Sequence, residues 1–560
     1  MHKTLRLAAI WVATWALLLL PDLLLYWSGY PVVAAVRFKP WLVAAIIALL
    51  LSTAKSRRFR MVAVALLVLN QIVWTGYAVY FGEPLRPEHL LVFREETTDT
   101  AIGALAEWRT FLPWIAALAM STTMLVLLQW REDRVRLGWR VSGWALSIAI
   151  AAMTVSWMLH PRIDAAFPGE HSGSIYGPYQ AAVGAMRLGM TAVAAASLNV
   201  HAQTQVPADR AAEPVTVVII MGESINATRL SLYGFKPDTT PELAKWRTAP
   251  PEGFTLFPEI GFSGGLDTYA SVPTFLRAAY WPAQAERFGV NLFELAYRQR
   301  VKTWYLSSQT ANFLEAAGGA PHAEDIEFVA NDAELAKRAE RLPDRGEDSF
   351  IFLHQRANHA PYTSSCAHFP KGHFAFRPPT DSGEDRRRTD YDNGLRCWDQ
   401  DVMALVTPFL KRRGAVHIFI TSDHSEIMGE DGHWGHGFTD LRVAMVPMML
   451  LTNRPQSNVA TSFKSWSPPT AYRLAQTVAL ALGVQLDTSG VPGDRFFINN
   501  TMPFALAGFT EVEQVKPGVY RVKNFALNGQ VLSRNVTNLP GIALANAITP
   551  ALSKSSLTSP

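Results

Sequence analysis

The sequence predicts a two-part fold, with an N-terminal α-helical transmembrane bundle followed by a C-terminal α/β domain. Two observations lead to this prediction. The first 160 residues of the 560-residue chain are dominated by Leu, Ala, Val, Ile and Trp, whereas the remainder has a mixed polar composition with frequent Pro and Gly. In that remainder, short β-branched runs alternate with helical patterns, which favours a largely parallel sheet.

The bundle is predicted from apolar stretches long enough to cross a bilayer, which takes about 20 residues of helix. A cleaved signal peptide could explain only the first stretch, and the core helices of a soluble protein are rarely so long and so numerous in succession. We therefore assign residues 1–160 to a transmembrane domain with five helices. The predicted spans are residues 7–27, 40–54, 61–81, 110–129 and 141–159.

Basic residues are concentrated in the loop after the second span and in the loop between the fourth and fifth spans, which places both loops in the cytoplasm. With the N-terminus inside and five spans, everything after residue 160 lies on the opposite side of the membrane. These basic residues are Lys55, Arg57, Arg58, Arg60, Arg131, Arg134, Arg136 and Arg140.

Residues 161–208 connect the two parts of the chain. Within them, the apolar but Gly-interrupted stretch that starts at residue 173 is typical of a helix lying on the membrane interface, and a polar linker follows it. We place the α/β domain at residues 209–525 and assign no role to the tail at residues 526–560.

Charge and cysteine content exclude some classes of function. The formal net charge is +4 and no long basic run occurs, so nothing indicates nucleic-acid binding. The two cysteines, Cys366 and Cys397, exclude a Cys-based zinc cluster and allow at most one disulfide. Their spacing does not decide whether they pair, and two free buried thiols fit the sequence about as well.

Polar residues occur where three predicted strands end. The run VTVVIIM leads into Glu223, FIFLH ends at His354 and leads toward His359, and AVHIFIT leads into Asp423 and His424. Because functional groups in open α/β sheets gather at the carboxyl ends of strands, we expect these side chains to lie close together. Carboxylates and imidazoles form a ligand set for zinc or another first-row divalent ion.

The segment TSDHSEIMGEDGHWGHG is the most informative part of this pattern. It places Asp423, His424, His433 and His436 within fourteen residues, in a Gly-rich loop after a predicted strand. A single histidine is more often a surface residue or a hydrogen-bonded core residue than a ligand. The joint pattern therefore carries the metal prediction.

The loop GFSGGLDTYASVPTF offers nucleophiles at Ser263, Thr268 and Ser271, before a predicted helix that starts near Pro273. A phosphate held by the N-terminus of that helix would face these hydroxyls. Gly-rich loops with hydroxyl residues are most often only turns, so this loop is weak support by itself.

At these residues the chain resembles the membrane phosphoethanolamine transferases of the alkaline phosphatase superfamily. The first motif of that family is similar to GESINATRLSLYGFKPDTTPEL, from Gly222 to Leu243. Five spans followed by a periplasmic domain is also the architecture of that family. The resemblance implies a C-terminal α/β domain of the alkaline phosphatase/sulfatase type, in the periplasm, on a multi-pass protein of the bacterial inner membrane.

The resemblance implies a zinc site made of Glu223, Thr268, Asp423 and His424. Thr268, in the stretch LDTYASVP, would also be the nucleophile. One zinc ion is implied by these ligands, and the loop histidine that matches His436 is associated in the family with the substrate phosphate or with a second zinc.

Catalytic roles are implied for two histidines, His359 in the stretch ANHAPY and His436, as phosphate clamps or proton-transfer groups. The loop from Arg94 to Thr100 resembles the donor-binding periplasmic loop of the family. Residues with weaker support as substrate contacts are Thr98, Asn312, His354 and His433, and Glu426 also falls at a family-like position.

The implied reaction is zinc-dependent transfer of phosphoethanolamine from phosphatidylethanolamine to an acceptor through a phosphothreonine. The acceptor would be lipopolysaccharide, at a core sugar or lipid A, or another envelope glycan. The implied partners are thus a lipid donor, a glycan or glycolipid acceptor and the membrane, and we expect a monomer.

This sequence departs from the family in two places. Many relatives flank the nucleophile loop with a disulfide, whereas Gly264 and Thr274 stand at those positions here, so other contacts must hold the loop. A lysine that contacts substrate in some lipid A enzymes is replaced, at Asn312. Both changes weaken lipid A as the acceptor, and the sequence Ser-Leu-Tyr-Gly in the first motif is closer to that of enzymes acting on lipopolysaccharide core sugars or other envelope glycans.

Two alternatives change the function. A periplasmic sulfatase or phosphatase, or a phosphoglycerol transferase, would keep the fold, but no formylglycine-forming C/S-x-P/A-x-R core surrounds Thr268. A non-enzymatic sensor or scaffold would be expected to lack a metal ligand or the nucleophile. Glu223, Thr268, Asp423 and His424 are all present, which favours an enzyme.

Overall fold

A computed structural model shows the protein as two compact units. One contains residues 1–193 together with the short segment 429–434, and the other contains residues 194–428 and 435–560. Apart from a few isolated positions, the structure describes residues 2–30, 36–82, 108–130, 139–160, 172–196, 205–207, 213–280, 291–370, 383–486, 493–501, 508–525 and 531–539.

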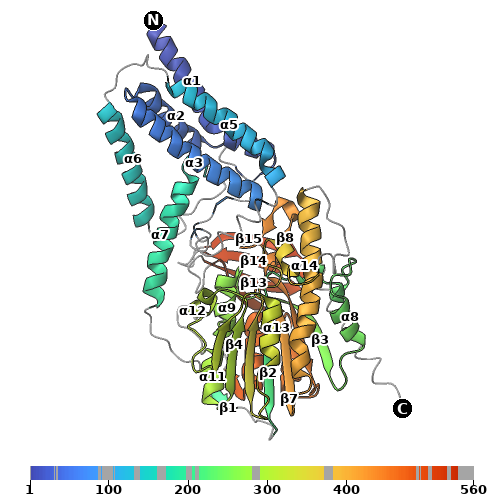
Figure 1. Ribbon diagram of the computed structural model, residues 1–560. Helices are drawn as coiled ribbons and strands as arrows, with labels where there is room; N and C mark the ends of the chain where they lie inside the picture. The colour runs from blue at the N-terminus through green and yellow to red at the C-terminus, as the bar shows by residue number, and fades with distance from the viewer. Residues whose placement is uncertain are drawn as a thin grey trace. The chain divides into compact units, whose positions relative to one another are not determined.

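The N-terminal unit is helical (Figure 1), and all five predicted spans fall on helices. Three of these helices are long and apolar enough to cross a membrane, and two apolar stretches, Phe38–Thr53 and Trp144–Leu159, are shorter. The number of spans therefore stays a prediction. The helices are α1 (His2–Trp27), α2 (Phe38–Thr53), α3 (Arg57–Phe81), α5 (Trp108–Trp130), α6 (Trp139–Leu159) and α7 (Gly177–Ala196).

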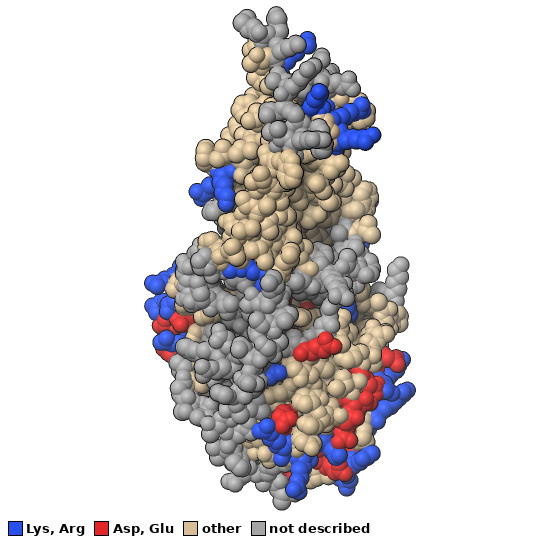
Figure 2. Space-filling view, turned by 90° about the vertical axis from the view of Figure 1, so that its left-hand side faces the viewer, with Lys and Arg blue, Asp and Glu red and all other residues tan. Residues whose placement is uncertain are grey.

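The surface of this helical unit is unusually apolar. Leu66, Leu69, Ile115 and Leu127 are each more than half exposed. On the face that Figure 2 shows, the described part of the N-terminal helices carries few charged side chains. Because soluble proteins rarely expose so many large apolar side chains together, these helices fit a lipid environment.

Buried polar side chains connect the N-terminal helices. Arg60 of α3 donates from Nε to the backbone oxygen of Gln129 on α5 at 2.9 Å, and Gln129 Nε2 donates to Thr14 Oγ1 of α1 at 2.8 Å. Gln71 of α3 donates to the backbone oxygen of Leu18 on α1 at 3.0 Å. Such bonds stabilise helix packing where no water competes for the polar groups.

The apolar stretch predicted as an interfacial helix forms α7, which begins at Gly177. The turn before it is held by Asp22 of α1, whose two carboxylate oxygens each lie 3.0 Å from the Ser174 nitrogen. A Cβ on Gly177 would lie 2.3 Å from the ring of Trp74, so only glycine allows this close approach. The interfacial position of α7 stays a prediction.

The second unit is built on a seven-stranded mixed sheet in the order β3-β10-β7-β2-β6-β4-β5. Strands β7, β2, β6, β4 and β5 run parallel, while β10 is antiparallel to both β3 and β7. The strands are β2 (Val215–Gly222), β3 (Thr255–Phe262), β4 (Lys302–Ser307), β5 (Asp325–Phe328), β6 (Ser349–His354), β7 (Ala415–Ser422) and β10 (Met445–Thr452).

The central strands of this sheet are covered on both faces, because every residue of β6 and β7 is buried. On one face, Val217 and Ile219 of β2 belong to the same core as Phe275 of α9, Phe293 of α11 and Val478 of α16. The helices of this unit are α8 (Pro241–Thr248), α9 (Thr268–Leu276), α11 (Leu292–Arg298), α12 (Ala311–Ala316), α13 (Asp332–Glu340), α14 (Gly383–Val406), α15 (Asn458–Lys464) and α16 (Ala471–Ala481).

A second, four-stranded antiparallel sheet packs on the first. Its strands, in spatial order, are β12 (Arg495–Asn499), β13 (Phe509–Lys516), β14 (Val519–Phe525) and β15 (Val531–Asn538). The ring of Phe262 at the end of β3 lies 4.8 Å from Phe496 and 5.2 Å from Tyr520, which joins the two sheets. Strand β15 lies beyond residue 525, so part of the segment without a predicted role completes this sheet.

The connecting segment also contributes a strand, β1 (Gln205–Pro207), which pairs antiparallel with β11 (Val484–Leu486). Strand β1 lies within the stretch predicted as a linker, and its partner lies in the α/β domain. The remaining short elements are η3 (Ala227–Arg229), η4 (Ser231–Tyr233), η5 (Tyr362–Cys366), η6 (Thr407–Phe409), β8 (Ile427–Met428), η7 (Glu430–Gly432), β9 (Trp434–Gly435) and η8 (Leu441–Ala444).

Cys366 and Cys397 form a disulfide, which decides between the two alternatives that the sequence left open. The bond joins η5 to the long helix α14, with the two Cα atoms 5.5 Å apart. It closes a loop with a sequence separation of 31 residues. Closing a loop of this size in the unfolded chain stabilises the fold by about 3 to 4 kcal/mol in the chain-entropy model.

Replacing both cysteines, Cys366→Ser with Cys397→Ser, should therefore lower the unfolding temperature of the purified full-length protein by several degrees. Thermal unfolding in the presence and absence of a reductant measures this effect. Reduced wild type should match the double variant, and an unfolding temperature that is insensitive to both changes would contradict the stabilising role.

Candidate metal and nucleophile site

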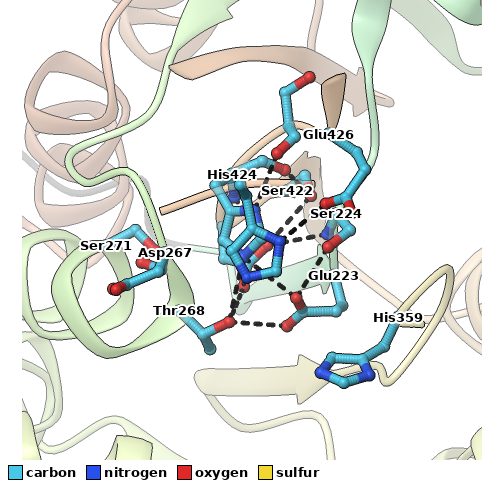
Figure 3. Close-up of polar contacts among 12 residues, drawn as sticks. Glu223, Ser224, Asp267, Thr268, Ser271, His359, Ser422, His424 and Glu426 are labelled. Atoms are coloured by element: carbon cyan, nitrogen blue, oxygen red, sulfur yellow. Dashed lines mark hydrogen bonds and ion pairs between the residues drawn. The ribbon is translucent and has the colours of Figure 1, made fainter. Parts of the chain in front are cut away.

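Four of the predicted site residues converge at the carboxyl edge of the large sheet (Figure 3). Glu223 directly follows β2, and Asp423 and His424 directly follow β7. Gly222 and Ser422 are partners in the parallel ladder, so the two strands end side by side. The predicted strand ends and their convergence are confirmed.

The hydroxyl of Thr268 completes this group from the N-terminus of α9. Asp267 caps the helix, because its Oδ1 accepts a hydrogen bond from the Ala270 nitrogen at 2.8 Å. The other two candidate nucleophiles bond their own loop: Ser271 Oγ donates to the Asp267 oxygen at 2.8 Å, and Ser263 Oγ donates to the Gly265 oxygen. Of the three hydroxyls, Thr268 is the one that contacts the acidic residues.

The donor atoms of the group lie within contact distance of each other. Thr268 Oγ1 is 2.8 Å from Glu223 Oε2, 2.6 Å from Asp423 Oδ2 and 3.3 Å from His424 Nε2. His424 Nε2 lies 3.1 Å from Glu223 Oε1 and 3.5 Å from Asp423 Oδ2. Ligand atoms of a tetrahedral zinc ion, each at about 2.0 Å from the metal, are roughly 3.3 Å apart, so these separations fit such a site.

Electrostatics also favour a cation at this place. Burial, and next the neighbouring Asp423, raise the pKa of Glu223 well above its usual range. Burial acts the same way on Asp423, but His424 and the hydrogen bonds from its neighbours outweigh it and lower its pKa to about 2. Neither carboxylate pairs with a lysine or arginine among the described residues, so a divalent ion would remove the repulsion between them.

His354, the last residue of β6, lies beside this group. Its ring, Glu223 and Asp423 each offer a ligand atom, and these atoms lie within 4.8 Å of each other. Burial lowers the pKa of His354 to about 4, so the ring is neutral at pH 7. Nδ1 lies 3.1 Å from Tyr305 Oη, whereas the buried Nε2 has no hydrogen-bond partner in the described part of the chain. That nitrogen is available to a ligand.

A second group of potential ligands consists of His424, Glu426 and His436. His436 Nδ1 lies 2.8 Å from Glu426 Oε2, and Tyr362 Oη donates to Glu426 Oε1 at 2.5 Å. Burial and His424 lower the pKa of His436, but Glu426 outweighs them, so the net pKa is raised. Because Glu426 occupies Nδ1 as an acceptor, Nε2 of His436 is the nitrogen left for other contacts.

His359 is buried in the loop after β6, with Nδ1 2.5 Å from the Ala360 oxygen. It is close enough to Glu223 to lower the pKa of that carboxyl. Thr98 and the side chain of Asn312 lie outside the described residues. His433 belongs to the segment 429–434 of the other unit, so it is not placed in this site.

One contact of the site was not predicted from the sequence. Gln309 Nε2 donates to Glu223 Oε2 at 2.7 Å and to the Gln355 oxygen at 3.2 Å. Gln309 lies just after β4, another parallel strand of the same sheet. Extending the strand-end argument to this fourth strand would have found it.

Asn499 supports the nucleophile loop at the two positions where many relatives have a disulfide. Its backbone nitrogen donates to the Gly264 oxygen at 2.9 Å, and its Nδ2 donates to Thr274 Oγ1 at 2.7 Å. A Cβ on Gly264 would lie 2.6 Å from Thr274 Cγ2, so the two positions are in close contact. The expectation that other contacts hold the loop is confirmed.

Comparison with known proteins agrees with this geometry. The sulfatase family model matches residues 215–469, which cover the large sheet and every converging residue of the site. This part of the chain is a sulfatase-family domain.

Two curated relatives from Escherichia coli are similar to parts of the chain. The putative transferase YhbX of strain K12 is 29% identical over 217 residues, which are 37% of this chain and 37% of the relative. The phosphatidylethanolamine transferase Mcr-1 is 26% identical over 260 residues, 40% of this chain and 45% of the relative. The chain thus spans less than half the length of each of these relatives.

A solved structure resembles most of the chain. The integral membrane lipooligosaccharide phosphoethanolamine transferase A from Neisseria meningitidis has a TM-score of 0.55 at 16% identity, covering 86% of this chain and 95% of the other. At this identity the likeness concerns the fold, and it confirms the predicted combination of N-terminal helices with a C-terminal sulfatase-type α/β domain.

The electrostatics of the site can be tested with Glu223→Gln, which keeps the shape of the side chain and removes one of the two buried carboxylates. Without metal, this variant should unfold at or above the temperature of wild type, because the repulsion from Asp423 is gone. Saturating Zn²⁺ at about 1,000 times its Kd would stabilise wild type by roughly 4 kcal/mol and should stabilise the variant much less. Thermal unfolding with and without Zn²⁺ measures both effects.

Glu259→Gln is the matched control, since burial raises the pKa of Glu259 to about 7 and, among the described residues, no bond joins its side chain to the site. This control should keep the full response to Zn²⁺. Equal stabilisation of Glu223→Gln and wild type by Zn²⁺ would show that Glu223 is not a ligand.

Proposed function

We propose that the protein transfers phosphoethanolamine from phosphatidylethanolamine to lipopolysaccharide or another envelope glycan, in a zinc-dependent reaction. Thr268 is the nucleophile and forms a phosphothreonine intermediate. The observation that carries this proposal is the Thr268 hydroxyl, which stands at a helix N-terminus and within 3.3 Å of two carboxylates and an imidazole.

The names of the similar proteins support the choice of reaction. Mcr-1 is named a phosphatidylethanolamine transferase, and the Neisseria meningitidis protein is named a lipooligosaccharide phosphoethanolamine transferase. A sulfatase-family domain alone would fit hydrolysis equally well. A transferase of this kind draws its donor from the bilayer, which the apolar N-terminal helices would occupy.

Glu223, Asp423, His424 and the Thr268 hydroxyl fit zinc, because they supply oxygen and nitrogen ligands at the right mutual distances. Bound zinc would lower the pKa of the Thr268 hydroxyl and withdraw charge from the phosphate. His354 and the group around Glu426 and His436 offer further ligand atoms, so a second ion fits the same edge of the sheet.

In the first half of the reaction, Thr268 Oγ1 forms a bond to phosphorus, and the bond from phosphorus to the glycerol oxygen breaks. The hydroxyl proton passes to the carboxylate of Glu223 or Asp423, whose nearest oxygens lie 2.8 Å and 2.6 Å from Thr268 Oγ1. Diacylglycerol leaves with a proton from His359 or His436. The N-terminus of α9 stabilises the negative charge on the transferred group.

In the second half, an acceptor hydroxyl or phosphate attacks the phosphothreonine from the side that diacylglycerol has left. The same histidine removes the acceptor proton, and Thr268 recovers its own. Glu426 holds the ring of His436 through Nδ1, so Nε2 can carry this proton. The product is the acceptor with one added phosphoethanolamine.

We place the helices in the bacterial inner membrane and the sulfatase-family domain in the periplasm. The basic loops next to the predicted spans support this orientation. The Cys366–Cys397 disulfide also supports it, because disulfides persist in the oxidising periplasm and are rare in the cytosol.

The test is mass spectrometry of envelope lipids and glycans from cells that express wild type or Thr268→Ala. Wild type should add one phosphoethanolamine unit to a glycolipid or glycan. The identity of the modified molecule then identifies the acceptor. Loss of the nucleophile should lower the yield of this adduct by roughly a thousandfold or more.

Ser271→Ala is the control, because it removes a neighbouring hydroxyl of the same loop that bonds only the loop backbone. Its adduct should match that of wild type. If no adduct appears and the purified protein instead releases phosphate or sulfate from small esters, the transferase proposal fails in favour of a hydrolase.

A further inference from the structure

Two residues beside the site adopt a backbone conformation that side chains other than glycine rarely take. Ser224, directly after Glu223, has φ 60°, and Ala357, two residues before His359, has φ 36°. Such conformations cost free energy and persist only where surrounding contacts impose them. Each occurs in a turn that carries a residue of the site, so whatever holds these turns also positions Glu223 and His359.

Tyr391 of α14 bonds to both turns. Its phenol oxygen donates to the Ser224 oxygen at 2.6 Å and accepts from the Asn226 nitrogen at 2.9 Å. Its backbone oxygen accepts from Asn358 Nδ2 at 3.1 Å. The residue is fully buried, and its ring packs edge-on against Tyr362 at 5.1 Å.

The two turns are also linked to each other and to the acidic residues. The Ser224 nitrogen donates to Asp423 Oδ1 at 3.1 Å, and the Asn358 nitrogen donates to the Glu223 oxygen at 3.3 Å. From the far side, Asp332 accepts from the nitrogen of Ala357 at 2.7 Å. A shift of the Ser224 turn would therefore move Glu223 relative to Thr268, and a shift of the Ala357 turn would move His359.

Helix α14 is a firm support for such contacts, because it is fixed at points away from the site. Cys397 forms the disulfide with Cys366, and Asp399 accepts from the Leu243 nitrogen of α8 at 3.0 Å. Asp392, next to Tyr391, forms a buried ion pair with Arg229 at 2.8 Å. These ties are independent of any metal.

We propose that Tyr391 is a positioning residue that couples the metal-ligand turn to the His359 turn. Its hydroxyl keeps Ser224 in the left-handed conformation and so aims the Glu223 carboxylate at Thr268. Its carbonyl orients Asn358 and with it the backbone that presents His359. The part of the inference that concerns turnover rests on the proposed function, whereas the part that concerns zinc binding does not.

Tyr391→Phe removes the hydroxyl and leaves the ring in place. In the full-length protein in detergent, zinc affinity measured by competition with a fluorescent chelator should fall by about tenfold or more, as for other supports of metal ligands. Tyr233→Phe is the matched control, because its phenol also donates to a backbone oxygen, that of Glu259 at 2.6 Å, away from the site. The control should keep the zinc affinity of wild type.

The proposal would be overturned if the zinc affinity of Tyr391→Phe stayed within about threefold of wild type. Losing a residue that supports a metal ligand lowers metal affinity by about tenfold or more. An equal loss of affinity in Tyr233→Phe would also overturn the proposal, since the effect would then be general destabilisation. If the protein fails to release headgroup from a fluorescent phosphatidylethanolamine at all, the proposed function fails, and the zinc measurement still decides the role of Tyr391.

Asn358→Ala tests the turn that carries His359 and leaves the Ser224 turn unchanged. This variant decides the proposal if Tyr391→Phe does not fold. It removes the side chain that bonds the Tyr391 oxygen and leaves the backbone bond to Glu223. Zinc affinity should stay within about threefold of wild type, whereas turnover of the labelled lipid should fall about tenfold or more. Unchanged turnover would contradict the coupling.

Discussion

The structure of the catalytic unit depends on one electrostatic constraint: two buried carboxylates, those of Glu223 and Asp423, share one hydroxyl. Thr268 Oγ1 lies within 2.8 Å of an oxygen of each, and neither carboxylate pairs with a lysine or arginine in the described chain. Such an arrangement is unfavourable without a cation, because burial and the repulsion from Asp423 both act against ionisation of Glu223. The site is therefore organised for a divalent ion that would also activate the hydroxyl.

The α/β fold itself provides most of this geometry. Parallel strands β2 and β7 end side by side, so the backbone alone delivers Glu223 and Asp423 to one edge of the sheet. Helix α9 begins at Thr268, so the proposed mechanism places the phosphate at the helix N-terminus. Two strained turns complete the edge, and Tyr391 of the disulfide-linked helix α14 holds both. Rigid elements thus carry the reactive groups, and polar contacts set their final positions.

Much of this could be predicted from the sequence, because the informative signals are local. A β-branched run followed by Glu, or by Asp-His, marks a strand end with a polar residue, and parallel strands bring such ends together. The apolar stretches of the first 160 residues are also local signals, and they predicted the N-terminal helices. Thr268 could be preferred over Ser263 and Ser271 only through the family resemblance, since all three share one Gly-rich loop.

The contacts that were missed join residues far apart in the chain. Gln309 bonds Glu223 across 86 residues, and Tyr391 bonds Ser224 across 167 residues. The strand-end argument, extended to β4, could have found Gln309, but no periodicity or spacing indicates that Tyr391 bonds Ser224. The Cys366–Cys397 bond was undecided because sequence separation does not show that two side chains meet, and β15 was missed because its strand completes a sheet that is defined only in three dimensions.

The central claim is that Thr268 carries the transferred group. The most direct measurement is peptide mass spectrometry of the full-length zinc-loaded protein, quenched in acid after incubation with phosphatidylethanolamine in the absence of acceptor. We expect phosphoethanolamine bound to the peptide that contains Thr268, with diacylglycerol released in an equal amount. Formation of diacylglycerol with an unmodified Thr268 peptide, or modification of another residue, would contradict it.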